Sequence, residues 1–210
     1  MKRLVPFLAL MILAVPAFAQ QETLFGGEFS SGGFGGPVVK FTPIRGELGI
    51  LVGGYGGWLI NHQFMIGGGG YGLVNNVRAS TEAEALYARP NRPLYVEFGY
   101  GGLMLEYIVE PSKLVHFNVQ CLVGAGGVRY REDWYDDLFD DNPDYFHSRT
   151  NDAVFVAEPA VNVEVNMTTW MRVTAGASYR YVNGVGELGG LSNKDLSNFS
   201  GSLALKFGLF

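Results

Sequence analysis

Several features that mark common protein classes are scarce or missing in this sequence of 210 residues. It contains one cysteine, Cys121, so no disulfide can form within the chain. After residue 20 there is no uncharged apolar run of about eighteen residues, which argues against a membrane-spanning helix. Basic residues are also few, 15 against 20 acidic ones, and this balance argues against nucleic acid as a partner.

The start of the chain has the features of an export signal. Two basic residues precede an apolar stretch that ends at Val15, and Ala17-Phe18-Ala19 forms a small-x-small cleavage site. No cysteine lies at this site to carry a lipid. We therefore expect a signal peptide over 1–19 and one exported domain over 20–210. Loss of the two basic residues changes the formal net charge from -5 to -7.

Apolar and polar residues alternate with a period of two along most of the remaining chain, which is the pattern of half-buried β-strands. The pattern is clean in the second half of the chain and noisier in the first half. The first strand is the least regular, because Pro37 limits its pairing. The expected strands are 34–42, 47–60, 64–74, 94–109, 115–125, 155–165, 171–181 and 200–209.

Within 94–109 the apolar positions shift by one residue. Leu94, Val96, Phe98 and Tyr100 share one parity, whereas the later apolar residues have the other. We expect a β-bulge at Gly101-Gly102, which would keep Glu97 and Glu106 on the same polar side. Glycine is abundant, at 30 of 210 residues against a usual share of about 7%. Glycine inside strands is typical of bulges, strong curvature or a tightly filled interior.

The connections between the expected strands alternate in length. Short ones at 61–63, 110–112 and 166–169 alternate with long ones at 75–93, 131–152 and 183–198, although the first connection, 43–46, is short. With the amino terminus in the periplasm, short inner turns and long outer loops are the layout of bacterial outer-membrane barrels.

On these features the chain resembles the small eight-stranded outer-membrane barrels, the OmpA-like and OmpX-like family. The resemblance includes an aromatic last strand over 203–210, Leu-Ala-Leu-Lys-Phe-Gly-Leu-Phe. It implies an all-β fold, a closed antiparallel up-and-down transmembrane β-barrel of about eight strands, in the cell outer membrane. It also implies that Phe207 and Phe210 form a terminal signal for the barrel-insertion machinery, although Phe210 is one residue out of phase with the preceding apolar positions.

The polar face of the expected strands carries charged residues, which inside a barrel must pair with one another or meet water. An eight-stranded barrel is just wide enough for side chains to fill, so we expect a plugged interior. The alternative is a narrow, porin-like channel for ions or small solutes. The expected interior charge network is Glu97, Glu106, His116, Glu158, Glu164, Arg172, Arg180 and Lys206.

The other face is apolar and ends in aromatic residues, as in the girdles of membrane barrels. A soluble secreted barrel with an apolar ligand cavity would turn this face inward and is a further alternative. Matching parity predicts Glu164 opposite Arg172 and Glu106 opposite His116 in the short hairpins. The expected girdle residues are Trp58, Tyr107 and Phe117 at the short turns, and Tyr130, Phe155, Tyr179 and Tyr181 at the long loops.

The loop 131–152 is strongly acidic and also holds aromatic residues. It lacks the spacing and the glycine of an EF-hand, so we expect a solvated loop that contacts lipopolysaccharide or another surface, and no metal site. Its central acids are Asp136, Asp137, Asp140, Asp141 and Asp144.

No constellation in the sequence favours an enzyme. Only His147 has a serine and a carboxylate nearby in the chain, and neighbouring side chains on an extended chain point apart. We expect no catalytic residue and no cofactor. The expected partners are outer-membrane lipid and lipopolysaccharide, with a monomer in the membrane.

Overall fold

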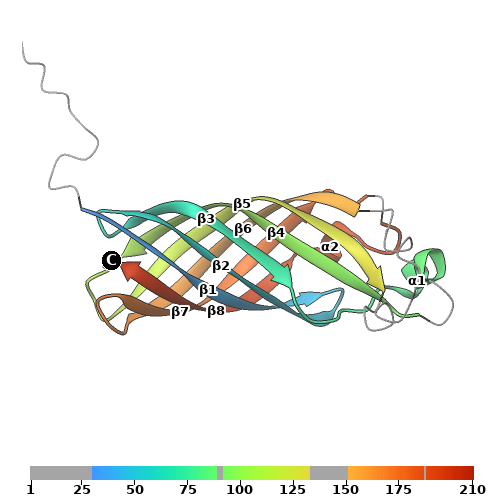
Figure 1. Cartoon of the computed structure of the whole chain (residues 1–210), viewed down its shortest axis with the longest axis horizontal. Helices are drawn as coiled ribbons and strands as arrows, with labels where there is room; N and C mark the ends of the chain where they lie inside the picture. The colour runs from blue at the N-terminus through green and yellow to red at the C-terminus, as the bar shows by residue number, and fades with distance from the viewer. Residues whose placement is uncertain (1–29, 89–91, 133–150, 187) are drawn as a thin grey trace, which may run out of the picture.

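Eight antiparallel strands, each hydrogen-bonded to its neighbours in chain order, close into a barrel in the computed structural model (Figure 1). The structure describes residues 30–88, 92–132, 151–186 and 188–210. The expected fold class and number of strands are confirmed. The strands are β1 (Ser31–Ile44), β2 (Glu47–Ile60), β3 (Phe64–Leu73), β4 (Leu94–Val109), β5 (Val115–Glu132), β6 (Asn151–Asn166), β7 (Met171–Asn183) and β8 (Asn198–Leu209).

The two ends of the barrel differ. At one end, here called the short-turn end, the chain closes β2–β3, β4–β5 and β6–β7 with short turns and β8 ends (Figure 1). The other end, the long-loop end, carries two short helices, α1 (Thr81–Tyr87) and α2 (Asn193–Leu196). In the described part of the chain, neither helix has the length and apolar character needed to cross a membrane.

Successive side chains along each strand point alternately into and out of the barrel, because a strand has a period of two. Even-numbered residues point inward on β1 and on β4 to β8, and odd-numbered residues point inward on β2 and β3. The outward positions are mainly apolar and well exposed. Examples from five strands are Val52, Leu103, Val119, Val161 and Leu203.

Inward-facing glycines make room for large inward-facing tyrosines. Tyr55 lies opposite Gly36, and Tyr100 lies opposite Gly126. A Cβ atom at Gly36 would lie 1.7 Å from the carbonyl oxygen of Leu205, so only glycine fits there without a shift of the backbone. The inward-facing glycines therefore serve a tightly filled interior, one of the roles expected from the sequence.

Strand β4 has no bulge, contrary to the expectation. It pairs with β3 and β5 in unbroken register through Gly101 and Gly102. Val96, Phe98 and Tyr100 consequently point inward and are buried, and Glu97 points outward. The reason is that aromatic residues fill the space left by the glycines, so the interior of this half of the barrel is itself apolar.

Two expected pairings are also wrong. Glu164 lies opposite Thr174, and Glu106 lies opposite Gln120, instead of Arg172 and His116. Each register differs from the expected one by an even number of residues, so the same residues still point inward and the same residues still point outward. Parity predicts which way a residue faces, whereas the length of the turn decides which residue lies opposite.

Candidate functional site

Four charged side chains meet inside the barrel toward the short-turn end, and we call them the Glu164 cluster. The carboxylate of Glu164 accepts a hydrogen bond from Arg172 Nη1 at 2.9 Å. It also pairs with the ammonium group of Lys206, which contacts the carboxylate of Glu106 as well. The four residues come from β4, β6, β7 and β8, so the cluster ties together strands on different sides of the barrel.

Neutral donors complete the shell around Glu164. Asn118 Nδ2 and Thr174 Oγ1 donate to its Oε2 atom at 3.0 and 3.1 Å. His116 Nε2 lies 3.1 Å from Oε1, and Asn162 Nδ2 donates to Asn118 Oδ1 at 2.7 Å. A buried carboxylate with this many hydrogen-bond partners is held in a single geometry.

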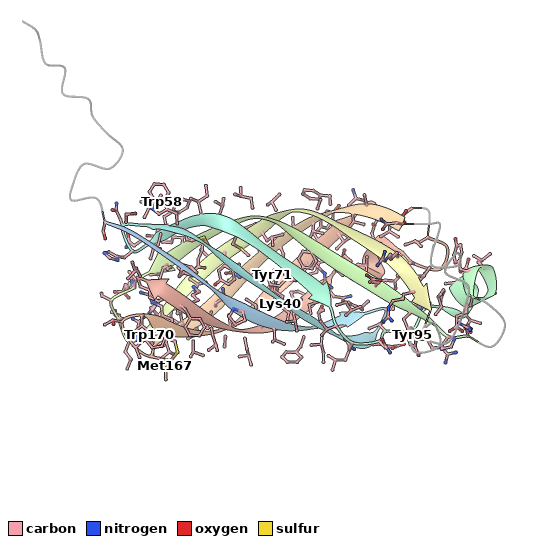
Figure 2. All side chains as sticks on the ribbon, viewed as in Figure 1. Lys40, Trp58, Tyr71, Tyr95, Met167 and Trp170 are labelled. Atoms are coloured by element: carbon pink, nitrogen blue, oxygen red, sulfur yellow. The ribbon has the colours of Figure 1, made fainter. Side chains whose placement is uncertain are left out.

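A second group, the Glu158 cluster, lies nearer the middle of the barrel. Lys40 Nζ donates to Glu158 Oε2 at 2.8 Å, and the hydroxyl groups of Tyr100 and Ser178 donate to the same carboxylate, each at 2.6 Å. Lys40 Nζ also lies 3.5 Å from the ring centroid of Tyr71, a cation–π contact. Figure 2 shows Lys40 and Tyr71 side by side within the barrel, far from both ends.

Arg180 continues the polar interior toward the long-loop end. Its Nε atom donates to the backbone carbonyl of Leu196 at 2.8 Å, and its Nη2 atom lies 3.4 Å from Thr42 Oγ1. The guanidinium carbon lies 5.3 Å from the ring centroid of Phe98. Arg180 therefore connects the barrel wall to the connection that follows β7.

That connection folds over the long-loop end, and we call residues 184–186 and 188–197 the outer lid. Asp152 accepts hydrogen bonds from two backbone N–H groups of the lid, at 2.9 and 3.2 Å. The Tyr130 hydroxyl and Arg45 Nη1 donate to lid carbonyls at 3.0 and 2.8 Å. Leu188 and Leu196 of the lid are buried. The lid is thus attached to several strands by hydrogen bonds and by apolar contact.

The charged interior groups are shielded from water. Arg180, Glu164 and Lys206 have no exposed surface, and Glu106 has 1%. Among the described residues, histidine aside, the buried carboxylates and the buried lysines and arginines are equal in number, four of each. The carboxylates are Glu106, Asp152, Glu158 and Glu164, and the basic residues are Lys40, Arg172, Arg180 and Lys206.

Seven of the eight residues expected in the interior network lie inside the barrel, and Glu97 does not. Glu97 points outward on β4 and receives two hydrogen bonds from Arg129, at 2.9 and 2.7 Å. Lys40 and Asp152 are interior charges that sequence reasoning missed. The signal for Lys40 was present, since it alternates with the apolar residues Val39 and Phe41.

The two residues of the expected insertion signal lie on opposite faces of the last strand. Phe207 points outward and stacks on Trp170, with 6.1 Å between ring centroids. Phe210 stacks on Phe34 at 5.5 Å and lies beneath the guanidinium of Arg172, 3.9 Å from its carbon. The acidic loop residues Asp136, Asp137, Asp140, Asp141 and Asp144 lie outside the described residues.

Aromatic side chains gather at both rims of the outward face. Trp58 and Trp170 mark the short-turn end in Figure 2, and Tyr95 lies near the long-loop end. Of the expected girdle residues, Tyr130 is an exception because it points inward to the lid. The others are exposed, namely Trp58, Tyr107, Phe117, Phe155, Tyr179 and Tyr181.

A comparison with one solved structure supports the fold. Neisserial surface protein A superposes with a TM-score of 0.53 and 12% identity, over 87% of this chain and 99% of that protein. Ail, the attachment invasion locus protein of Yersinia pestis, gives a TM-score of 0.45 and 10% identity, over 85% and 97% of the two chains. No family model and no curated protein matches the sequence. At the level of fold, the resemblance to small eight-stranded outer-membrane barrels is confirmed.

Proposed function

We propose that this protein is a monomeric barrel of the bacterial outer membrane, with a structural or surface-interaction role and an interior closed to solutes. Its long loops would face the cell exterior, and both ends of the mature chain would face the periplasm. The outward face supports a position in lipid, because on β5 it is apolar or small from Val115 to Gly127, thirteen residues. A membrane-crossing strand needs about 9–11 residues.

The observation that carries the closed interior is the burial of its charges. Beside a water-filled channel, Glu164, Lys206 and Arg180 would have exposed surface, and they have none. The Glu164 and Glu158 clusters fill the lumen, and the outer lid lies across one end. A narrow channel would require these ion pairs to separate, which leaves buried charges without partners and costs several kcal/mol.

The same arrangement supports a protein without catalytic activity. The carboxylates of Glu106, Glu158 and Glu164 are engaged with Lys40, Arg172 and Lys206 inside the barrel, where a substrate would have no access to them. We expect the exposed loops to act by contact, with lipopolysaccharide and the surrounding lipid as neighbours.

We further propose that the last strand serves as the insertion signal, with Phe207 and Phe210 in different roles. Phe207 faces outward, where a receptor of the insertion machinery can bind it. Phe210 packs against Phe34 and helps to close the short-turn end.

The test is to fold the purified protein into phosphatidylcholine vesicles that contain a trapped small fluorescent dye. We expect a heat-modifiable shift in gel mobility, the mark of a folded membrane barrel, without faster release of the dye. Dye release that scales with the amount of folded protein would favour the channel. A wild-type protein that stays monomeric in buffer without detergent or lipid would contradict the membrane barrel.

A further inference from the structure

Charge is confined to one place on the outward face of the barrel. Among the described strand residues whose parity points them outward, three are acidic or basic: Glu97, Arg129 and Arg131. All three are on the adjacent strands β4 and β5, near the long-loop end. Around the rest of the circumference the outward residues near this rim are neutral, for example Phe41, Tyr181 and Phe199.

The arginines have hydrogen-bond donors to spare. Glu97 fixes the guanidinium of Arg129 through Nε and Nη2, which leaves Nη1 without a partner in the described part of the chain. Arg131 contacts Asn76 Oδ1 through Nη2 at 3.2 Å and forms no ion pair with a described carboxylate. Tyr95 lies directly opposite Arg131, so its ring shares the same face.

A third arginine flanks the other side of Tyr95. Arg78 forms an isolated backbone bridge with Tyr95, and Arg131 lies opposite Tyr95 on the neighbouring strand. Arg78 and Arg131 therefore lie on either side of this tyrosine. Arg78 is itself paired with Glu84 at 2.8 Å, and this hydrogen bond holds the pKa of the Glu84 carboxyl below its usual value. Arg131 is therefore the arginine here without a described carboxylate partner, and Arg129, paired with Glu97, contributes its unused Nη1 donor.

The position of the two arginines along the barrel axis suits a lipid headgroup. Arg129 is fourteen residues along β5 from Val115, the first residue at the short-turn end. At about 3.3 Å per residue and a strand tilt of about 40°, this is roughly 35 Å along the axis. The apolar band of such barrels is about 25 Å tall, so Arg129 would lie above it, among the headgroups.

Directly beneath the arginines the outward surface has no side chains. Gly72, Gly99 and Gly127 form one row across β3, β4 and β5, and Gly70 and Gly101 continue it in the next row. A Cβ atom at Gly72 would meet nothing within 4 Å, and at Gly99 or Gly127 its nearest contact would be at 3.4 Å. A Cβ atom at Gly70 would likewise have its nearest contact at 3.4 Å, whereas one at Gly101 would lie 2.9 Å from the carbonyl oxygen of Gly69. These five residues, the glycine floor, present no side chain to the outside, and at four of them the space above the backbone is open.

We propose that Arg129, Arg131 and Tyr95 bind the phosphate of an outer-leaflet phosphoglycolipid, and that one of its acyl chains lies on the glycine floor. This inference rests on the proposed function, since it requires the long-loop end to face the outer leaflet. Guanidinium groups bind phosphate oxygens through charge-assisted hydrogen bonds, and a planar fork with unused donors suits two oxygens at once. The adjoining bare apolar surface selects a lipid over a free phosphate ion.

The test is a native mass-spectrometry titration of the folded protein in detergent with diphosphorylated lipid A. We expect the double variant Arg129→Gln/Arg131→Gln to bind the lipid with an affinity at least about tenfold lower than that of the wild type. Lys113→Gln is the matched control, because it removes a basic side chain that is exposed in a turn at the opposite end. Gly72→Leu should also weaken binding, since it fills the floor without removing charge.

The outcomes separate the two proposals. Equal lipid binding by the double variant and by Lys113→Gln, with both showing heat-modifiable mobility, overturns this inference alone. Failure of the wild type to fold into vesicles overturns the membrane barrel and this inference together. Displacement of the lipid by inorganic phosphate at equal concentration overturns the assignment to a lipid, because the floor would then contribute nothing.

Discussion

An arginine substituted on the outward face should lower the free energy of unfolding by an amount that depends on its depth in the bilayer. Val119 and Val115 point outward on the same strand, with 47% and 51% of their surface exposed. Val119 lies four residues further along β5, opposite Tyr107 and Val161, which is about 10 Å deeper along the axis of a tilted strand. In a membrane, Val119 would be close to the midplane and Val115 at the edge of the apolar band.

Val119→Arg should therefore destabilise the folded state by about 2–4 kcal/mol, and Val115→Arg by about 0–1 kcal/mol. The assay is equilibrium urea unfolding from phosphatidylcholine vesicles, with both variants and the wild type measured together. Because residue type, strand and exposure are matched, the difference of about 2–3 kcal/mol reports depth in the bilayer. Equal losses of stability at the two positions would show that Val115 and Val119 do not lie at different depths in a bilayer. If both costs were close to zero, the outward face would be a solvent face, as in a soluble barrel.

Two further predictions concern the interior. Glu164→Gln should destabilise the protein by about 3–5 kcal/mol, because Lys206 and Arg172 lose a buried partner. Glu97→Gln breaks an exposed pair and should cost about 0–1 kcal/mol in the same urea titration. Similar costs for the two variants would contradict the assignment of Glu164 to the inward face and Glu97 to the outward face. Replacing residues 186–195 by two glycines should leave heat-modifiable mobility intact, because a change of loop length costs little. The same replacement should expose the buried position 200, so that the Ser200→Cys variant in a Cys121→Ser background reacts with a membrane-impermeant maleimide. An unreactive cysteine would show that the outer lid does not seal this end.

The alternation of apolar and polar residues predicted the strands and, for most of them, which residues point inward and which point outward. It succeeded over most of β5 to β8, where the outward residues are mainly apolar and the inward ones mainly polar or small. It failed on the outer half of β4, where the inward residues are apolar or aromatic and the outward face carries Glu97 and glycines. There the choice depends on volume, since Phe98 and Tyr100 fill space that opposing glycines leave, and volume is a property of several strands at once.

The candidate site was predicted in its chemistry and not in its contacts. That Glu158 and Glu164 would meet basic partners follows from the cost of burying a charge. The identity of the partners does not follow, because Lys40 reaches Glu158 from β1, 118 positions away in the chain. The lid was missed as well, although Ser192 and Asp195 form a capping box that could have revealed α2.

If the barrel spans a membrane with its lumen closed by ion pairs and by the outer lid, ions should not pass through it. Single-channel recording with the folded wild-type protein in a planar bilayer measures this passage. We expect insertion, shown by heat-modifiable mobility of the recovered protein, with no conductance steps above the baseline. Stable conductance steps from the wild type would contradict a closed lumen, because ions would then pass Glu164, Lys206 and Arg180, which have no surface exposed to water.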